Sequence, residues 1–138
     1  MKPLNKSAEK VFRSAIAKLG EGTHVKIDNS EGTYMPLVVE RIGSVAFAST
    51  PDKPFKLYSF AHYGEQNGDA MRDPDVVMLD SPAGLFPVSF RNDYVGVDNE
   101  ALGYDANGNI TGFRNRMQAD IVSFCNTWAK NLKDQQDL

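Results

Sequence analysis

A long central segment of alternating apolar and polar residues, enclosed by two segments of helical periodicity, is the feature that most constrains this fold. From His24 to about Val97, apolar residues recur at every second position, as in strands with one buried face. Residues 5–19 instead repeat apolar side chains at i, i+3 and i+4, and so does a segment that ends near Leu132. The chain therefore reads as a helix, a series of strands and a second helix.

Turn-forming residues divide the central segment into about six strands. Asn29–Gly32 and the Asn67-Gly68 pair favour hairpin turns, because asparagine and glycine adopt positive φ readily. Residues 50–54 contain two prolines and predict a loop, and the Asn-Gly pair at 107–108 predicts a small hairpin. In sequence letters, the expected strands are HVKID, TYMPLVVERI, SVAFAS, FKLYSFAHYGEQ, DAMRDPDVVML and LFPVSFRNDYVGV.

The connections between these strands determine the expected fold class. Because no helical pattern lies between them, we expect antiparallel neighbours joined by hairpins, not parallel βαβ units. The expected fold is one α+β domain, residues 1–138, with an antiparallel sheet of about six strands and the N-terminal and C-terminal helices packed on one face. Trp128 and Cys125 lie in the apolar stripe of the second helix and are expected in the core. The tail at about 133–138 is expected to be frayed.

Composition and cysteine usage favour an ordinary globular domain in a reducing compartment. The chain is 41% hydrophobic and 24% charged, and its one cysteine cannot form an internal disulfide. No long apolar run follows the lysines of the first twenty residues, so neither a secretory signal nor a membrane anchor is expected. A cytoplasmic location is the resulting expectation.

The charges are distributed unevenly along the chain. Residues 65–105 hold nine acids and two arginines, a net charge of −7, so the rest of this −3 chain carries +4. Such asymmetry bears on partners, and it disfavours nucleic-acid binding by the middle segment. A basic stripe on the first helix leaves a nucleic-acid-binding face as one alternative, beside a simple solvated surface. Its members are Lys2, Lys6, Lys10 and Arg13.

The densest polar run, HYGEQNGDAMRDPDVVML at residues 62–79, is the candidate site. Its hairpin is expected to gather acidic and basic side chains at one end of the sheet, where a late part of another strand approaches. We interpret this surface as a binding site without a catalytic residue, metal or cofactor. The candidate binding residues are His62, Glu65, Asp69, Arg72, Asp73, Asp75, Asn92 and Asp93.

Two other interpretations of the same run stay open. A histidine beside carboxylates can act as a general base, so a metal-dependent hydrolase or nuclease at a His62/Asp73 cluster is one alternative. However, the spacing matches no known metal-binding loop. A purely structural account is also sufficient: Arg72 pairs with Glu65 or Asp73 across the strands, and Asp73-Pro74 forms a bulge.

Several of these stretches resemble an uncharacterised domain family of bacterial plasmids, conjugative elements and phages. The matching stretches are HYGEQNGDAMRDPDVVM, FPVSFRNDYVGVD and FCNTWAKNLKDQ, with YMPLVVERIG fitting as well. In that family the domain stands alone or is attached to antirestriction-type or DNA-processing proteins. Residues 98–113 match nothing in the resemblance, and we expect them to be a local elaboration. No catalytic residue is implied.

The resemblance and the charge pattern together predict a non-enzymatic accessory protein of a mobile genetic element. It is expected to act by protein–protein binding, with inhibition of a host defence system, of the antirestriction or anti-CRISPR type, as the specific hypothesis. An acidic sheet end predicts a partner protein with a basic surface, because complementary potentials speed association and set the register of docking. Nucleic acid is a less favoured partner, and no membrane partner is expected.

Overall fold

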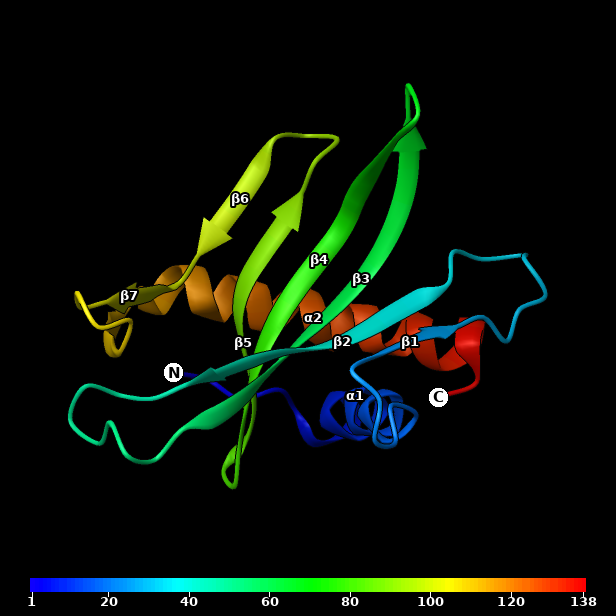
Figure 1. Cartoon of the computed structure of the whole chain (residues 1–138). Helices are drawn as coiled ribbons and strands as arrows, with labels where there is room; N and C mark the ends of the chain where they lie inside the picture. Colours follow the sequence, from blue (N-terminus) through cyan, green and yellow to red (C-terminus); the bar gives the residue numbers. More distant parts are fainter.

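The computed structural model describes residues 1–138 and consists of one six-stranded antiparallel sheet, a two-stranded hairpin and two helices (Figure 1). The strands of the large sheet lie in sequence order from β1 to β6, as a simple meander. The expected α+β class, with its N-terminal and C-terminal helices, is confirmed. The elements are α1 (Lys6–Ala17), β1 (His24–Ile27), β2 (Leu37–Val45), β3 (Phe55–Gln66), β4 (Asp69–Ser81), β5 (Gly84–Asn92), β6 (Val97–Glu100), β7 (Leu102–Tyr104), β8 (Ile110–Phe113) and α2 (Asn115–Gln136).

Both helices bury their apolar faces on one side of the sheet. The Phe12 ring of α1 packs edge-on against Phe60 of β3, with ring centroids 4.9 Å apart, and lies 5.7 Å from the Trp128 ring of α2. Trp128 is therefore the anchor that the helical stripe predicted. Cys125 is fully buried beside it, and this burial raises the pKa of its thiol, as expected for a core cysteine.

A smaller apolar cluster covers the lower part of the other sheet face. The β7–β8 hairpin, which the Asn-Gly pair at 107–108 predicted, packs over the sheet there, and Ile110 bonds to the backbone of residues 46–48. The cluster has five buried members, which are Val45, Leu79, Val88, Leu102 and Ile110. The upper part of this face is left open. Neither helix has the length and apolar character that a membrane-spanning helix requires.

Two strand predictions are wrong in their boundaries, although the number of strands in the large sheet agrees. The stretch SVAFAS is not a separate strand, because its first residues continue β2 beyond a bulge between Arg41 and Gly43. Gly43 has φ of +128°, which lets the strand continue past the extra residue. Conversely, LFPVSFRNDYVGV is two strands, since residues 93–96 form a turn between β5 and β6.

The prolines of the sheet lie where a missing N–H is tolerated. Pro36 immediately precedes β2. Asp73-Pro74 supplies the extra residue of β4 opposite His62, which confirms the expected bulge. Pro87 adjoins the extra residue of β5 at Val88. These interruptions bend the sheet and separate the outer ends of β3 and β4 from the rest.

The tail, residues 133–138, is not frayed: α2 continues to Gln136, which is fully buried. The Gln136 side chain accepts from the Asn29 backbone N–H at 2.7 Å and donates to the Met35 carbonyl at 3.0 Å. Asn29 in turn donates from its side chain to the Gln136 carbonyl at 2.8 Å. Polar contacts with the β1–β2 connection, invisible to hydrophobic periodicity, thus hold the end of the helix.

Candidate functional site

The open sheet face carries two rows of side chains that cross all six strands. Val39, Phe60 and Val76 are paired across neighbouring strands and form part of the core under the helices. The residues just before and just after each of them along its strand therefore point to the opposite face. One row consists of Lys26, Val38, Ala61, Asp75, Arg91 and Asp98. The second consists of His24, Glu40, Ser59, Val77, Ser89 and Glu100.

A depression of about 260 Å³ lies where these rows cross β4, β5 and β6. In the first of these rows, Asp75 is paired directly with Arg91, and its carboxylate accepts a 2.6 Å hydrogen bond from the Ser59 hydroxyl. The lining mixes two arginines with three acids and thus offers both donors and acceptors. Its residues are Arg72, Asp75, Val77, Ser89, Arg91, Asp98 and Glu100.

Asp93, just after β5, links β4 and β5 at the end of the sheet from which the β3–β4 hairpin extends. Its carboxylate accepts from the Arg72 backbone N–H at 2.8 Å and from Arg72 Nε at 3.0 Å. Arg91 Nε donates to the other oxygen at 3.2 Å. Hydrogen bonds from Arg72, first from its backbone and then from its side chain, lower the pKa of Asp93 to about 2.

Glu100, at the end of β6, is affected in the opposite sense. Burial raises the pKa of Glu100, and the nearby charge of Asp98 acts in the same direction. The Tyr104 hydroxyl donates to Glu100 Oε1 at 2.7 Å, and burial together with this carboxylate raises the pKa of Tyr104. The charged form of Glu100, which lines the depression at the end of β6, is therefore disfavoured relative to its protonated form.

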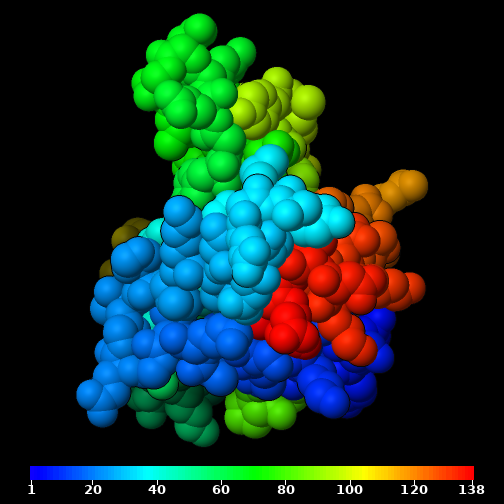
Figure 2. Space-filling view, turned by 90° about the vertical axis from the view of Figure 1, so that its right-hand side faces the viewer, coloured from blue at the N-terminus to red at the C-terminus, as the bar shows by residue number.

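The outer part of the β3–β4 hairpin, residues 63–72, projects beyond the sheet, and we call it the finger. In Figure 2 its green tip rises above the body of the molecule, with the yellow-green β5–β6 turn beside it. Residues 65–70 are all exposed. At its base, the Tyr94 side chain packs against Gly64, where a Cβ atom would collide with the tyrosine hydroxyl, and Asn92 donates to Asp73 at 2.8 Å.

His62 lies just below the finger but is directed into the core. Its Nε2 accepts from Trp128 Nε1 at 3.2 Å, since an indole nitrogen can only donate, and its Nδ1 therefore donates to the Pro36 carbonyl at 3.0 Å. The imidazole is only 8% exposed. Nε2 thus contacts α2 through Trp128, and Nδ1 contacts the chain just before β2, so both ring nitrogens are engaged within the fold.

The remaining predicted residues do gather near the upper end of the sheet, in two groups. Glu65 and Asp69 flank the exposed tip, as the Asn-Gly turn predicted. The other group braces the base of the finger or faces the depression, and comprises Arg72, Asp73, Asp75, Asn92 and Asp93.

The expected partner of Arg72 is wrong, because Arg72 pairs with Asp93 and not with Glu65 or Asp73. Asp93 follows the neighbouring strand β5 and also accepts from the Arg72 backbone, which fixes the pair geometrically. No three or more His, Cys, Asp or Glu side chains gather where they could share a metal ion. His62 and Asp73 thus do not form one cluster, because His62 bonds to Pro36 and Trp128, whereas Asp73 accepts from Asn92.

The basic stripe of α1 is partly neutralised. Arg13 binds Glu9 at 2.7 Å and Asp80 of β4 at 3.0 Å. Lys6 lies 3.6 Å from the same Glu9. Lys2 precedes the helix, and only Lys10 stands in it without an ion pair. The four side chains therefore do not form one continuous free cationic face.

Sequence reasoning missed the serines and acids that complete the two rows. Ser59, Ser89 and Glu100 each stand at an alternate position in an otherwise apolar or mixed strand, which is a weak signal for an open face. Which of them lie side by side depends on strand register, and two bulges shift that register.

Comparison with curated proteins and with solved structures found no match to this chain. A family model does match residues 6–138 and includes residues 98–113, which the sequence had suggested to be a local elaboration. With nearly its whole length matched, the chain belongs to the family described as a domain of unknown function, DUF6908.

Proposed function

We propose that this protein is a binding module that docks a partner protein on the finger and the adjoining polar sheet face. The finger is the observation that carries this proposal. A two-stranded hairpin beyond the edge of a core buries little apolar surface of its own and is marginally stable when isolated. Here it is nevertheless braced at its base by Asp93, Asn92 and Tyr94.

Preorganisation favours binding, because less conformational entropy is lost when a partner docks. The tip side chains from Glu65 to Ala70 are all exposed. Glu65 and Asp69 form no ion pair within the molecule. They are free to meet lysine or arginine side chains, which supports a partner with a basic surface.

The finer proposal is that the protein is an accessory of a bacterial mobile genetic element, acting in the cytoplasm against a host defence system. Its support is the resemblance of three sequence stretches, of which the longest, residues 62–78, contains the whole finger. The longest stretch that resembles the family thus includes the tip of the surface proposed for docking.

A photo-crosslinking amino acid at Gln66 tests the docking surface. We expect covalent capture of one discrete partner in bacterial cells, and its loss when Glu65→Lys and Asp69→Lys are introduced together. A crosslinker at exposed Lys53 and the charge reversals Glu21→Lys and Asp52→Lys serve as matched controls, since these side chains are also exposed. Capture that is equal at both positions, or unaffected by reversal at the tip, argues against docking at the finger.

Phage plating tests the finer proposal separately. Expression of the chain in strains that carry a restriction or CRISPR system should raise plating efficiency, and the Glu65→Lys/Asp69→Lys variant should not. If plating stays unchanged while the crosslink persists, the binding function stands and the defence-inhibitor hypothesis fails.

A further inference from the structure

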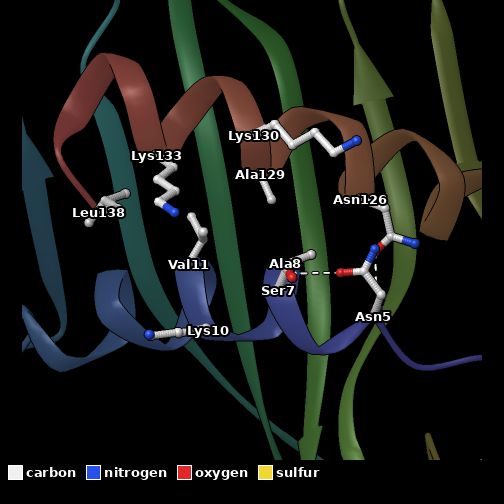
Figure 3. A pocket seen from close by; sticks show the side chains of 10 residues that line it. All are labelled: Asn5, Ser7, Ala8, Lys10, Val11, Asn126, Ala129, Lys130, Lys133 and Leu138. Atoms are coloured by element: carbon white, nitrogen blue, oxygen red, sulfur yellow. Dashed lines mark hydrogen bonds between the residues drawn. The ribbon is translucent and has the colours of Figure 1, made fainter.

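A groove of about 460 Å³ runs between α1 and α2, on the molecular surface away from the finger. Figure 3 shows the two helices side by side, with Asn5, Ala8 and Val11 facing Asn126, Ala129 and Lys133 in the same order along the groove. The Asn5 backbone N–H donates to Asn126 Oδ1 at 3.1 Å and closes one end. The floor is apolar, formed by Ala8, Val11 and Ala129.

Charge distinguishes this groove from the rest of the protein. The chain as a whole carries −3, but the ten residues of the groove include three lysines and no acidic side chain, and the terminal carboxylate of Leu138 offsets one of the three positive charges. Lys133 points toward Val11, while Lys10 and Lys130 extend along the borders. All three are exposed, and none forms an ion pair within the molecule. In contrast, Arg13 on another side of α1 is paired twice.

We infer that the groove between α1 and α2 is a second docking site, which takes an acidic amphipathic helix of a partner protein. Small side chains on the floor allow close approach of a third helix, and the aliphatic stems of the lysines add apolar walls. Carboxylates of the incoming helix then meet the three ammonium groups. The inference goes beyond the finger site, because it concerns another face and a ligand of opposite charge.

The lining disfavours nucleic acid as the occupant. It contains neither an aromatic ring for base stacking nor an arginine for bidentate phosphate contacts. The floor residues Ala8, Val11 and Ala129 are exposed by only 2%, 6% and 2%, so the apolar contact area for an occupant comes mainly from the aliphatic stems of the lysines. The fold therefore does not need an occupant for stability, and reversible, salt-sensitive binding is expected.

Fluorescence anisotropy with a designed probe tests the inference. The probe is a labelled acidic helix with leucines on one stripe and glutamates flanking them, and its lysine counterpart and a duplex DNA are compared. We expect the acidic peptide alone to bind, and its affinity to fall with added salt. The Lys10→Glu/Lys130→Glu/Lys133→Glu variant should weaken it by about tenfold or more, which corresponds to the loss of a few exposed ion pairs.

Two further variants locate the binding. Lys26→Glu/Lys53→Glu/Lys56→Glu makes the same charge change at other exposed lysines and should bind the probe as the wild type does. Ser7→Trp fills the groove without a charge change and should weaken binding. Equal loss in both triple variants, no effect of Ser7→Trp, tighter binding of duplex DNA, or no binding of the acidic peptide each overturns the inference. Circular dichroism checks that every variant is folded.

Discussion

Two carboxylates near the depression have pKa values shifted in opposite directions, because their surroundings differ. Asp93 accepts three hydrogen bonds from Arg72 and Arg91, which favour its charged form. Glu100 lies in a half-buried position beside Asp98, where water solvates its charge less well. A carboxylate near the depression can therefore stabilise the fold or weaken it, depending on which partners the strands bring to it.

Asp93→Asn is expected to loosen the finger. The folded pKa of Asp93 is about 2 against an ordinary value of 3.8, so its contribution is fully present above pH 3.8 and is lost as pH falls through about 2. Amide hydrogen exchange at residues 63–72 should become severalfold faster in the variant. In the wild type the same loosening should appear on acidification. Unchanged exchange in both cases would contradict the bracing role.

Glu100→Gln is expected to stabilise the protein slightly at neutral pH. Because the folded pKa of Glu100 is raised, its stability contribution is greatest below the ordinary value of 4.5 and is lost as pH rises through the folded pKa. Glutamine keeps an acceptor for the Tyr104 hydroxyl but carries no charge. Urea unfolding should show a gain of up to about 1 kcal/mol at pH 7, reduced by solvent screening, and none at pH 3. A gain that persists at pH 3 would point to another cause.

At the scale of elements, polar contacts decide where α2 ends and where the hairpin of β3 and β4 is held. The last turn of α2 is attached to the β1–β2 connection through Gln136, and the base of the finger is attached to the β5–β6 turn through Asn92 and Asp93. In both cases segments distant in the sequence supply the partner. Hydrogen bonds of this kind determine where an element lies relative to its neighbours, whereas local sequence determines whether the element forms.

Gln136→Ala should destabilise the protein by roughly 1–3 kcal/mol, because it leaves the Asn29 N–H and the Met35 carbonyl without their partners. Gln135→Ala is the matched control, since the neighbouring side chain is only half-buried. Equilibrium urea denaturation of both variants measures the difference. Equal stabilities would mean that the end of α2 is not held through Gln136.

For the whole molecule, the core under the helices connects α1, β3 and α2 around the single tryptophan. Exposed polar side chains lie on the other sheet face and on the finger, and the basic groove lies between the helices. One cohesive core thus supports two surfaces of different charge, which are the two docking sites that we propose.

Unfolding of the whole chain is expected to be a single cooperative transition, as is usual for domains of this size. Trp128 fluorescence reports the core, and far-ultraviolet circular dichroism reports the helices and strands. Their urea transitions should coincide, with one midpoint. Two separated midpoints would indicate that the β7–β8 hairpin or the helices form an independent unit, and would contradict the single-domain prediction.

Hydrophobic periodicity, turn residues and the absence of helical patterns between strands were sufficient to predict the α+β class, the helices and the Asn67-Gly68 hairpin. They are local properties of the chain. The end of β2 was predicted wrongly, because Gly43 allows the strand to continue into Ser44 and Val45, which the pattern had assigned to a separate strand.

Tertiary structure alone decided which polar side chains meet. His62 carries the same chemistry in the sequence as a catalytic histidine, yet the parity of β3 directs it to Trp128 in the core. Arg72 binds Asp93 and not a nearer acid, because bulges shift the register and β5 lies alongside. The lysine groove joins side chains more than one hundred residues apart. Such contacts depend on register and packing between distant segments, which the sequence pattern of any one segment does not encode.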